Sequence, residues 1–219
     1  MRVVLLVLAT LAVAQGHMRF LEPPCRACIW RFPEYASYNP EPRGNDDEFW
    51  CGNERLLEDV AGRCGICGDD VNQPMPRETE RGGRYWRDLQ VRTYAAGATI
   101  PIHLHSNTQN HGGGMEVHLC AAQFETEDCF QKLVMGNGDT YWPLNLAEGT
   151  MNIETTVTLP AGVTCEKCTL RAHYRGAQAW GTCDNSRTCV CNPNSGDPPG
   201  GMGCSEQQTF RSCSEIKIV

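Results

Sequence analysis

The sequence contains no block of lysines and arginines and, past its first residues, no long apolar run. Lys and Arg together number 19 against 26 Asp and Glu, which gives a formal net charge of -7. This balance makes the chain a poor candidate for binding nucleic acid or an anionic membrane, because both attract basic patches. Its length of 219 residues is that of a single domain.

The one long apolar stretch covers residues 3–14, directly after Met1 and Arg2. It is too short to span a bilayer, and Ala14 and Gly16 behind it match a small-x-small cleavage site. We therefore interpret residues 1–16 as a secretory signal peptide and expect a secreted, extracellular protein. Cleavage there would make His17 the first residue.

Cysteine is abundant, with 14 residues. In a secreted chain this even number predicts up to seven disulfides. Three CxxC pairs could instead hold zinc, as they do in intracellular proteins, an alternative that the signal peptide disfavours; the pairs are Cys25/Cys28, Cys64/Cys67 and Cys165/Cys168. The spacing alone does not give the connectivity.

Apolar and polar residues alternate with period two from about residue 98 onward, in segments 98–106, 114–120, 151–160, 168–176 and 212–219. In the first segment Ile102 and Leu104 share one face, and His103 and His105 share the other. No long helical periodicity competes with this pattern. The sequence therefore predicts an all-β protein, an antiparallel β-sandwich.

Two regions lack this alternation. Residues 17–90 are rich in proline, glycine, charge and aromatic side chains and are expected to form a long loop region fastened by disulfides, with a short helix at 53–60. Residues 183–204 consist mostly of turn residues and cysteines. We expect them to form a second loop held by disulfides, without strand or helix.

A terminal His17 would offer two nitrogen donors to one metal, the α-amine and the imidazole. One further imidazole would complete a three-nitrogen site of the kind that suits Cu(II). The competing interpretation is chance, since a signal peptidase must leave some residue first. His111 is the preferred second imidazole because it lies in a loop between two strands.

The remaining histidines are His103, His105, His118 and His173. They fall within strand patterns. His103 and His105 are expected on a solvated strand face, with a His-x-His metal site as the alternative.

Five blocks of sequence, in order, resemble the lytic polysaccharide monooxygenases of auxiliary activity family 15, which occur largely in invertebrates. They are HMRFLEPPCRACIWRF (17–32), CGICGD (64–69), QNHGG (109–113), YRGAQAWGTC (174–183) and CSEQQTFRSCSEI (204–216). The resemblance implies an immunoglobulin-like β-sandwich, with residues 17–219 as a single copper monooxygenase domain. It also implies one copper ion, cycling between Cu(II) and Cu(I), held by His17 and His111.

The resemblance also implies roles for two further residues. Phe210 would close one axial face of the copper without binding it, and Gln208 would offer a polar side chain near the metal. Three positions depart from the family pattern. They are Met18 in place of Gly, for which packing is expected over ligation, Gln109 in place of a small residue, and Gln208 in place of Glu. Cys25 and Cys28 stand where Ser is more common and are expected to add a disulfide.

The expected activity is oxidative cleavage of a crystalline β-1,4-linked polysaccharide at C1 or C4, with chitin ahead of cellulose. An external electron donor and oxygen or hydrogen peroxide would be required, and the protein is expected to be a monomer. Four aromatic side chains could provide flat surfaces on which the substrate stacks: Trp30, Tyr35, Tyr38 and Trp50. The competing interpretation is that they are buried within the loops. Two alternatives stay open: a non-catalytic copper protein, and a disulfide-rich chitin-binding module in which His17 is incidental.

Overall fold

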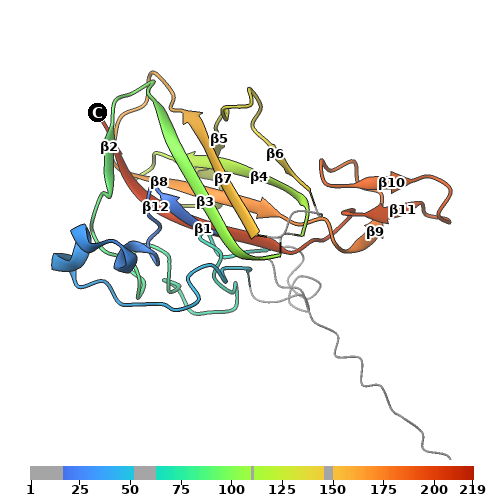
Figure 1. Cartoon of the computed structure of the whole chain (residues 1–219), viewed down its shortest axis with the longest axis horizontal. Helices are drawn as coiled ribbons and strands as arrows, with labels where there is room; N and C mark the ends of the chain where they lie inside the picture. Colours follow the sequence, from blue (N-terminus) through green and yellow to red (C-terminus); the bar gives the residue numbers. More distant parts are fainter. Residues whose placement is uncertain (1–16, 52–62, 110, 146–149) are drawn as a thin grey trace, which may run out of the picture.

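Two β-sheets pack face to face in the computed structural model, which describes residues 17–51, 63–109, 111–145 and 150–219 (Figure 1). The smaller sheet has the strand order β1-β3-β7, with β1 (Arg19–Glu22), β3 (Thr99–Gln109) and β7 (Thr150–Thr158). The larger sheet has the order β2-β12-β8-β4-β5, with β6 also paired to β4. Its strands are β2 (Arg92–Tyr94), β4 (Gly113–Cys120), β5 (Gln131–Lys132), β6 (Trp142–Leu144), β8 (Cys165–Arg175) and β12 (Thr209–Ile218). The predicted β-sandwich is confirmed, and the five predicted segments correspond to β3, β4, β7, β8 and β12.

Alternation along the strands builds the core. Ile102 and Leu104 of β3 face Val117 of β4 and Leu170 of β8 across the space between the sheets, and all four are almost fully buried. Burying a side chain of this size stabilises a fold by about 1.5–3 kcal/mol. The sandwich therefore follows from the period-two pattern.

The long loop region also holds structure that the sequence did not predict. Its first residues form β1, which pairs antiparallel with β3, so the expectation of a region made only of loops was wrong for this segment. The pattern around Phe20 is too short to stand out as a strand. The described residues include three short 3-10 helices, η1 (Ile29–Arg31), η2 (Pro33–Tyr38) and, outside this region, η3 (Glu127–Cys129). The predicted helix at 53–60 lies outside the described residues.

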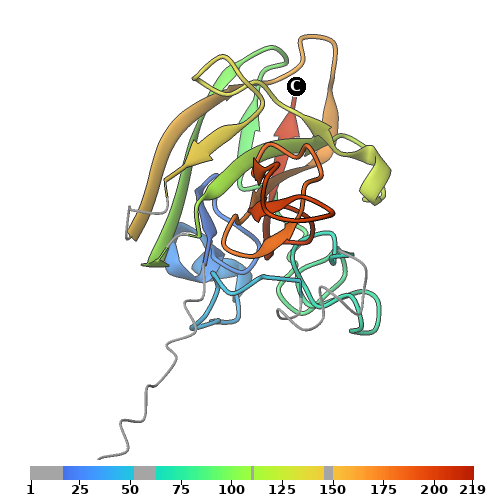
Figure 2. The same cartoon turned by 90° about the vertical axis from the view of Figure 1, so that its right-hand side faces the viewer.

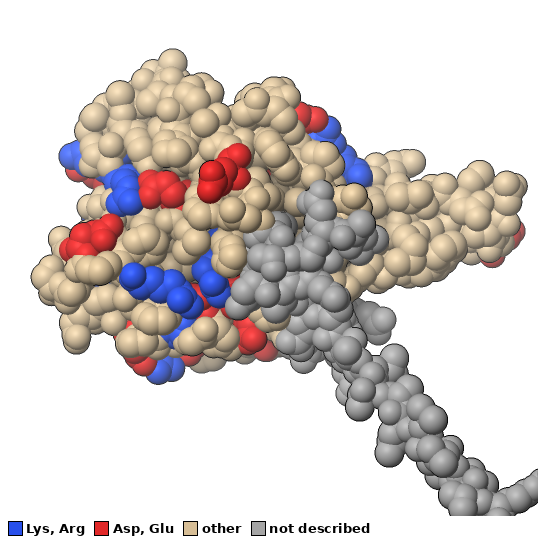
Figure 3. Space-filling view, in the orientation of Figure 1, with Lys and Arg blue, Asp and Glu red and all other residues tan. Residues whose placement is uncertain are grey.

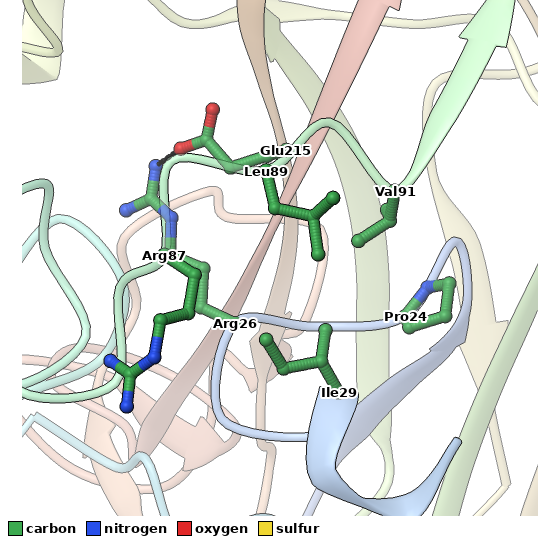
Figure 4. A pocket seen from close by; sticks show the side chains of 7 residues that line it. All are labelled: Pro24, Arg26, Ile29, Arg87, Leu89, Val91 and Glu215. Atoms are coloured by element: carbon green, nitrogen blue, oxygen red, sulfur yellow. Dashed lines mark hydrogen bonds and ion pairs between the residues drawn. The ribbon is translucent and has the colours of Figure 1, made fainter. Parts of the chain in front are cut away.

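The loops gather against one side of the sandwich, drawn in blue to teal below the sheets in Figures 1 and 2. They bury charge on the outer face of the larger sheet. Arg26 and Arg81 meet Glu125 and Glu215 there, and every one of these side chains is at most 14% exposed. Figure 4 shows Arg26 reaching Glu215 beside a cavity of about 10 Å³, which is room for one water. This face is therefore polar but buried, because paired charges replace contacts with bulk solvent.

A third, three-stranded sheet projects from the sandwich, to the right in Figure 1 and toward the viewer in Figure 2. It consists of β9 (Trp180–Thr182), β11 (Gly200–Met202) and β10 (Val190–Asn192), in the order β10-β11-β9. The expectation that residues 183–204 contain no strand was therefore wrong. A Cβ on Gly201 would lie 2.0 Å from the carbonyl oxygen of Val190, so the glycine, read as a turn signal, instead permits close strand pairing.

All 14 cysteines form disulfides, which confirms the predicted seven. Two CxxC motifs form internal disulfides, Cys25–Cys28 and Cys165–Cys168. The cysteines of the motif at 64–67 pair with other residues instead, as Cys51–Cys64 and Cys67–Cys213. The others are Cys120–Cys129, Cys183–Cys191 and Cys189–Cys204. No thiolate is left for zinc.

Candidate metal centre

His17 lies directly before β1, with its side chain buried. The next residue, Met18, points into the core and is fully buried, so the expectation that it packs is confirmed. The main chain of Met18 donates a hydrogen bond of 2.9 Å to the carbonyl of Asp47. His17 itself is 3.1 Å from Glu48, measured from Nε2 to Oε1. The loop at 45–48 therefore holds the residues just before β1 in two ways, through the main chain of Met18 and through the ring of His17.

His111 stands between β3 and β4 and is 1% exposed. Its main-chain N–H donates to the Tyr174 hydroxyl at 2.7 Å, and its carbonyl accepts from the N–H of Ala177 at 3.0 Å. A Cβ on Gly176 would come within 3.2 Å of the His111 Cβ, so the chain passes close by. Residues on and just after β8 therefore fix the position of His111 from three sides.

Burial lowers the pKa of His111 to about 4, which is the largest influence on this ring. A hydrogen bond with the Gln178 side chain raises the pKa of His111, and the charge of His17 lowers it further. The two histidines therefore interact electrostatically. His111 is therefore neutral at neutral pH, the form in which imidazole binds a metal.

Aromatic rings back the second histidine. The Phe210 ring lies nearly parallel to His111, with centroids 6.1 Å apart and planes at 15°. The Tyr174 ring stacks on Phe210, with centroids 5.2 Å apart and planes at 21°. Both are fully buried, since β8 and β12 point them into the sandwich. Phe210 thus closes the inner side of the candidate centre.

Gln208 lies in the same place, buried just before β12. Its Oε1 accepts a hydrogen bond of 2.8 Å from Nε2 of Gln178. Its own Nε2 is buried and makes no hydrogen bond. A buried donor without an acceptor is costly, so this atom suits a site that receives a further polar group or ligand. Two imidazoles beside such a donor fit a bound metal.

The other histidines lie elsewhere. His103 and His105 share the outer face of the smaller sheet, where His103 contacts Asn152 at 2.5 Å. His118 and His173 stack on the outer face of the larger sheet, 5.4 Å apart. Within the described ranges, none of the four belongs to a group of three or more side chains with metal-ligand spacing. This arrangement favours the interpretation of His103 and His105 as side chains on the outer strand face.

Sequence reasoning missed two residues of the candidate centre, Glu48 and Gln178, and one exposed aromatic close to them in sequence, Trp180. Gln178 lies inside a block that was noted, but only its contact with Gln208 marks it out. Glu48 belongs to an acidic run that reads as loop surface. Trp180 lies two residues beyond Gln178 and is 60% exposed.

Most of the four aromatic side chains expected to stack on the substrate are buried or covered by other side chains. Tyr35 is buried, with its hydroxyl bonded to the Val91 carbonyl, and Trp50 packs against the core. Trp30 is half-buried under the guanidinium of Arg31. Only Tyr38 of these four is exposed. The side chain of Gln109 lies outside the described part of the structure.

Comparison with known proteins gives consistent results. The model of the family described as lytic polysaccharide mono-oxygenase, cellulose-degrading, matches residues 13–216. A solved lytic polysaccharide monooxygenase of family AA15 from Thermobia domestica, in the Cu(I) state, is 34% identical. The match covers 92% of this chain and 98% of that one, with a TM-score of 0.78.

More distant structures also match. One is a lytic polysaccharide monooxygenase important for efficient utilization of chitin in Cellvibrio japonicus, 10% identical. That match covers 92% of this chain and 99% of that one, with a TM-score of 0.45, too low to carry an argument. No curated protein matches the sequence. The family match over nearly the whole chain and the 34% identity decide the assignment: the chain belongs to the lytic polysaccharide monooxygenases, copper-dependent enzymes that cleave polysaccharides oxidatively, and within them to auxiliary activity family 15.

Proposed function

We propose that residues 1–16 are removed on secretion and that residues 17–219 form a single copper domain. In the mature protein the α-amine and ring of His17, together with the ring of His111, would bind the ion. The observation that carries this proposal is the electrostatic interaction between these two histidines, 94 positions apart, together with the unpartnered Nε2 of Gln208, which Gln178 links to the His111 ring. Within the described residues, no helix is long and apolar enough to cross a membrane.

Bound copper supplies one-electron chemistry, for which an external donor and oxygen or hydrogen peroxide are the co-reactants. With hydrogen peroxide, one oxygen atom would be inserted into a C–H bond at C1 or C4 of the sugar and the other would leave as water. With oxygen, the donor must supply two electrons, and two protons are taken up, to give the same products. The hydroxylated carbon then loses its glycosidic bond. No pair of carboxylates for hydrolysis is required.

The protein residues position the reacting groups and restrict access to them. Phe210 stacks on the His111 ring and Tyr174 stacks on Phe210, so these two rings would close the inner side of the centre. Gln178 connects the His111 ring to Gln208 and orients both. Gln208 Nε2 would donate a hydrogen bond to an oxygen atom arriving at the site. Orientation of this kind is the contribution that a protein makes to a cofactor reaction.

The projecting sheet offers a surface for the substrate. Trp180, Met202 and Val190 lie opposite one another on β9, β11 and β10, and all three are exposed. Figure 3 shows that this part of the molecule carries few charged side chains on the face in view. Sugar rings in a crystalline polysaccharide present apolar C–H faces, which suit an aromatic and aliphatic strip. A crystalline β-1,4-linked polysaccharide would bind on this strip, and chitin stays ahead of cellulose because the family occurs largely in invertebrates.

Copper titration tests the proposed site. The secreted protein with His17 first should bind one Cu(II) tightly by calorimetry, and a variant with one residue added before His17 should bind it much more weakly. The added residue turns the amine into an amide but leaves every imidazole in place. His111→Ala should have a similar effect. Equal binding by all three proteins would place the metal elsewhere.

Adsorption tests the substrate surface. Trp180→Ala should weaken adsorption to chitin and cellulose, whereas Phe124→Ala, which also removes an exposed aromatic side chain, should leave it unchanged. Oxidised oligosaccharides released from each polysaccharide then decide between the two substrates. Unchanged adsorption by Trp180→Ala would remove the strip from the proposal.

A further inference from the structure

The ring of His17 has one identified carboxylate contact, with Glu48, and its geometry selects one of the two nitrogens. Glu48 Oε1 is 3.1 Å from Nε2, the ring nitrogen farther from the main chain. An ionised carboxylate can only accept a hydrogen bond, so Nε2 must carry the proton in this contact. In a neutral imidazole, the basic lone pair then belongs to Nδ1.

Nδ1 is also the nitrogen that chelation requires. The α-amine and Nδ1 of one histidine can close a six-membered ring around a metal, whereas Nε2 points away from the amine and cannot reach the same ion. We infer that Glu48 is a positioning residue, which holds His17 in the Nε2–H tautomer and directs Nδ1 toward the metal. This inference rests on the proposed function, in which His17 is a ligand.

Glu48 is itself held in place. The Asn45 side-chain amide donates to its second oxygen, and the Glu48 N–H donates to the Asn45 carbonyl at 3.2 Å. The neighbouring Asp46 and Asp47 form ion pairs with Arg19, at 2.8 Å and 2.5 Å. Arg19 is in β1, two residues after His17. The acidic loop is therefore held against the strand that begins two residues after the ligand, which fixes the carboxylate relative to the His17 ring.

The arrangement predicts a defined loss when Glu48 is changed. A carboxylate that orients a metal-binding histidine is typically worth about 10–100-fold in metal affinity. Glu48→Ala should therefore raise the Kd for Cu(II) about 10–100-fold and change the Cu(II) electron paramagnetic resonance spectrum. Glu48→Gln keeps an oxygen acceptor and should recover most of the affinity. Glu34→Ala removes an exposed glutamate from η2 and serves as the control.

Nitrogen NMR of the His17 ring in the metal-free protein tests the tautomer without copper. The native protein should show the Nε2–H form, and Glu48→Ala should show a mixture of both forms. An Nδ1–H form in the native protein, or unchanged copper affinity in a folded Glu48→Ala, would overturn the inference. If the native protein shows the Nε2–H form but binds no copper, the proposed function fails while the Glu48–His17 contact stands.

Discussion

Replacing Glu215 by Gln should destabilise the protein strongly, because it unbalances a buried group of charges. Glu215 and Glu125 together face Arg26 and Arg81 between the loops and the larger sheet. Burial alone would lower the pKa of Arg26, but the charges of Glu215 and Glu125 raise it well above its usual range. The amide would leave two guanidinium groups with one carboxylate, in a site where the Arg26 side chain is 2% exposed.

The expected cost is about 3–5 kcal/mol, the range measured when one partner of a buried ion pair is removed. For a domain of this size, 1 kcal/mol corresponds to about 2–4 °C in Tm. Calorimetry should therefore show Tm lower by about 6–20 °C, and urea unfolding should show a lower midpoint with an unchanged slope.

Glu166→Gln is the matched control. Glu166 pairs with Lys217 at 2.7 Å on the same sheet, but its side chain is 80% exposed. Such surface pairs contribute about 0–1 kcal/mol, so this variant should unfold close to the native protein. If Glu215→Gln also unfolded within about 1 kcal/mol of the native protein, the cluster would not stabilise the fold and the reasoning would be wrong.

Three further changes test other parts of the structure. Tyr174→Phe leaves the buried N–H of His111 without its acceptor and should cost about 1–3 kcal/mol in unfolding free energy; a stability equal to that of the native protein would contradict the contact. Burial raises the pKa of Asp69 to about 6 against the opposing hydrogen bonds from Thr79, so its uncharged form stabilises the fold below about pH 4 and this stabilisation is lost as pH rises through 6. Between about pH 4 and pH 6, the unfolding free energy of Asp69→Asn should therefore rise by roughly 2–3 kcal/mol relative to that of the native protein, as measured by urea unfolding. A difference that does not change with pH would contradict the raised pKa of Asp69. Gly201→Ala should speed hydrogen exchange at the amides of β10 and β11 with little effect on the main sheets, and slow exchange there would show that the strands tolerate a Cβ.

Local patterns in the sequence were enough to predict the sandwich. Alternation in segments such as the one around Ile102 and Leu104 sets which residues face inward, and a strand needs only near neighbours in sequence to show it. The same holds for the disulfide-rich composition. The strands β1, β10 and β11 escaped prediction, because each has only three or four residues and depends on a partner far along the chain.

The components of the centre can be read directly from the sequence: a histidine behind a cleavage motif, a second histidine in a loop, and the blocks shared with the family. Their arrangement in space depends on tertiary packing. Cys67 bonds to Cys213 across a separation of 146 residues, and Gln178, in the loop between β8 and β9, reaches Gln208 just before β12. Glu48 contacts the His17 ring only because the acidic loop is fastened to β1. Periodicity and spacing report local conformation, whereas such contacts depend on how distant segments pack, and this is a property of the whole fold.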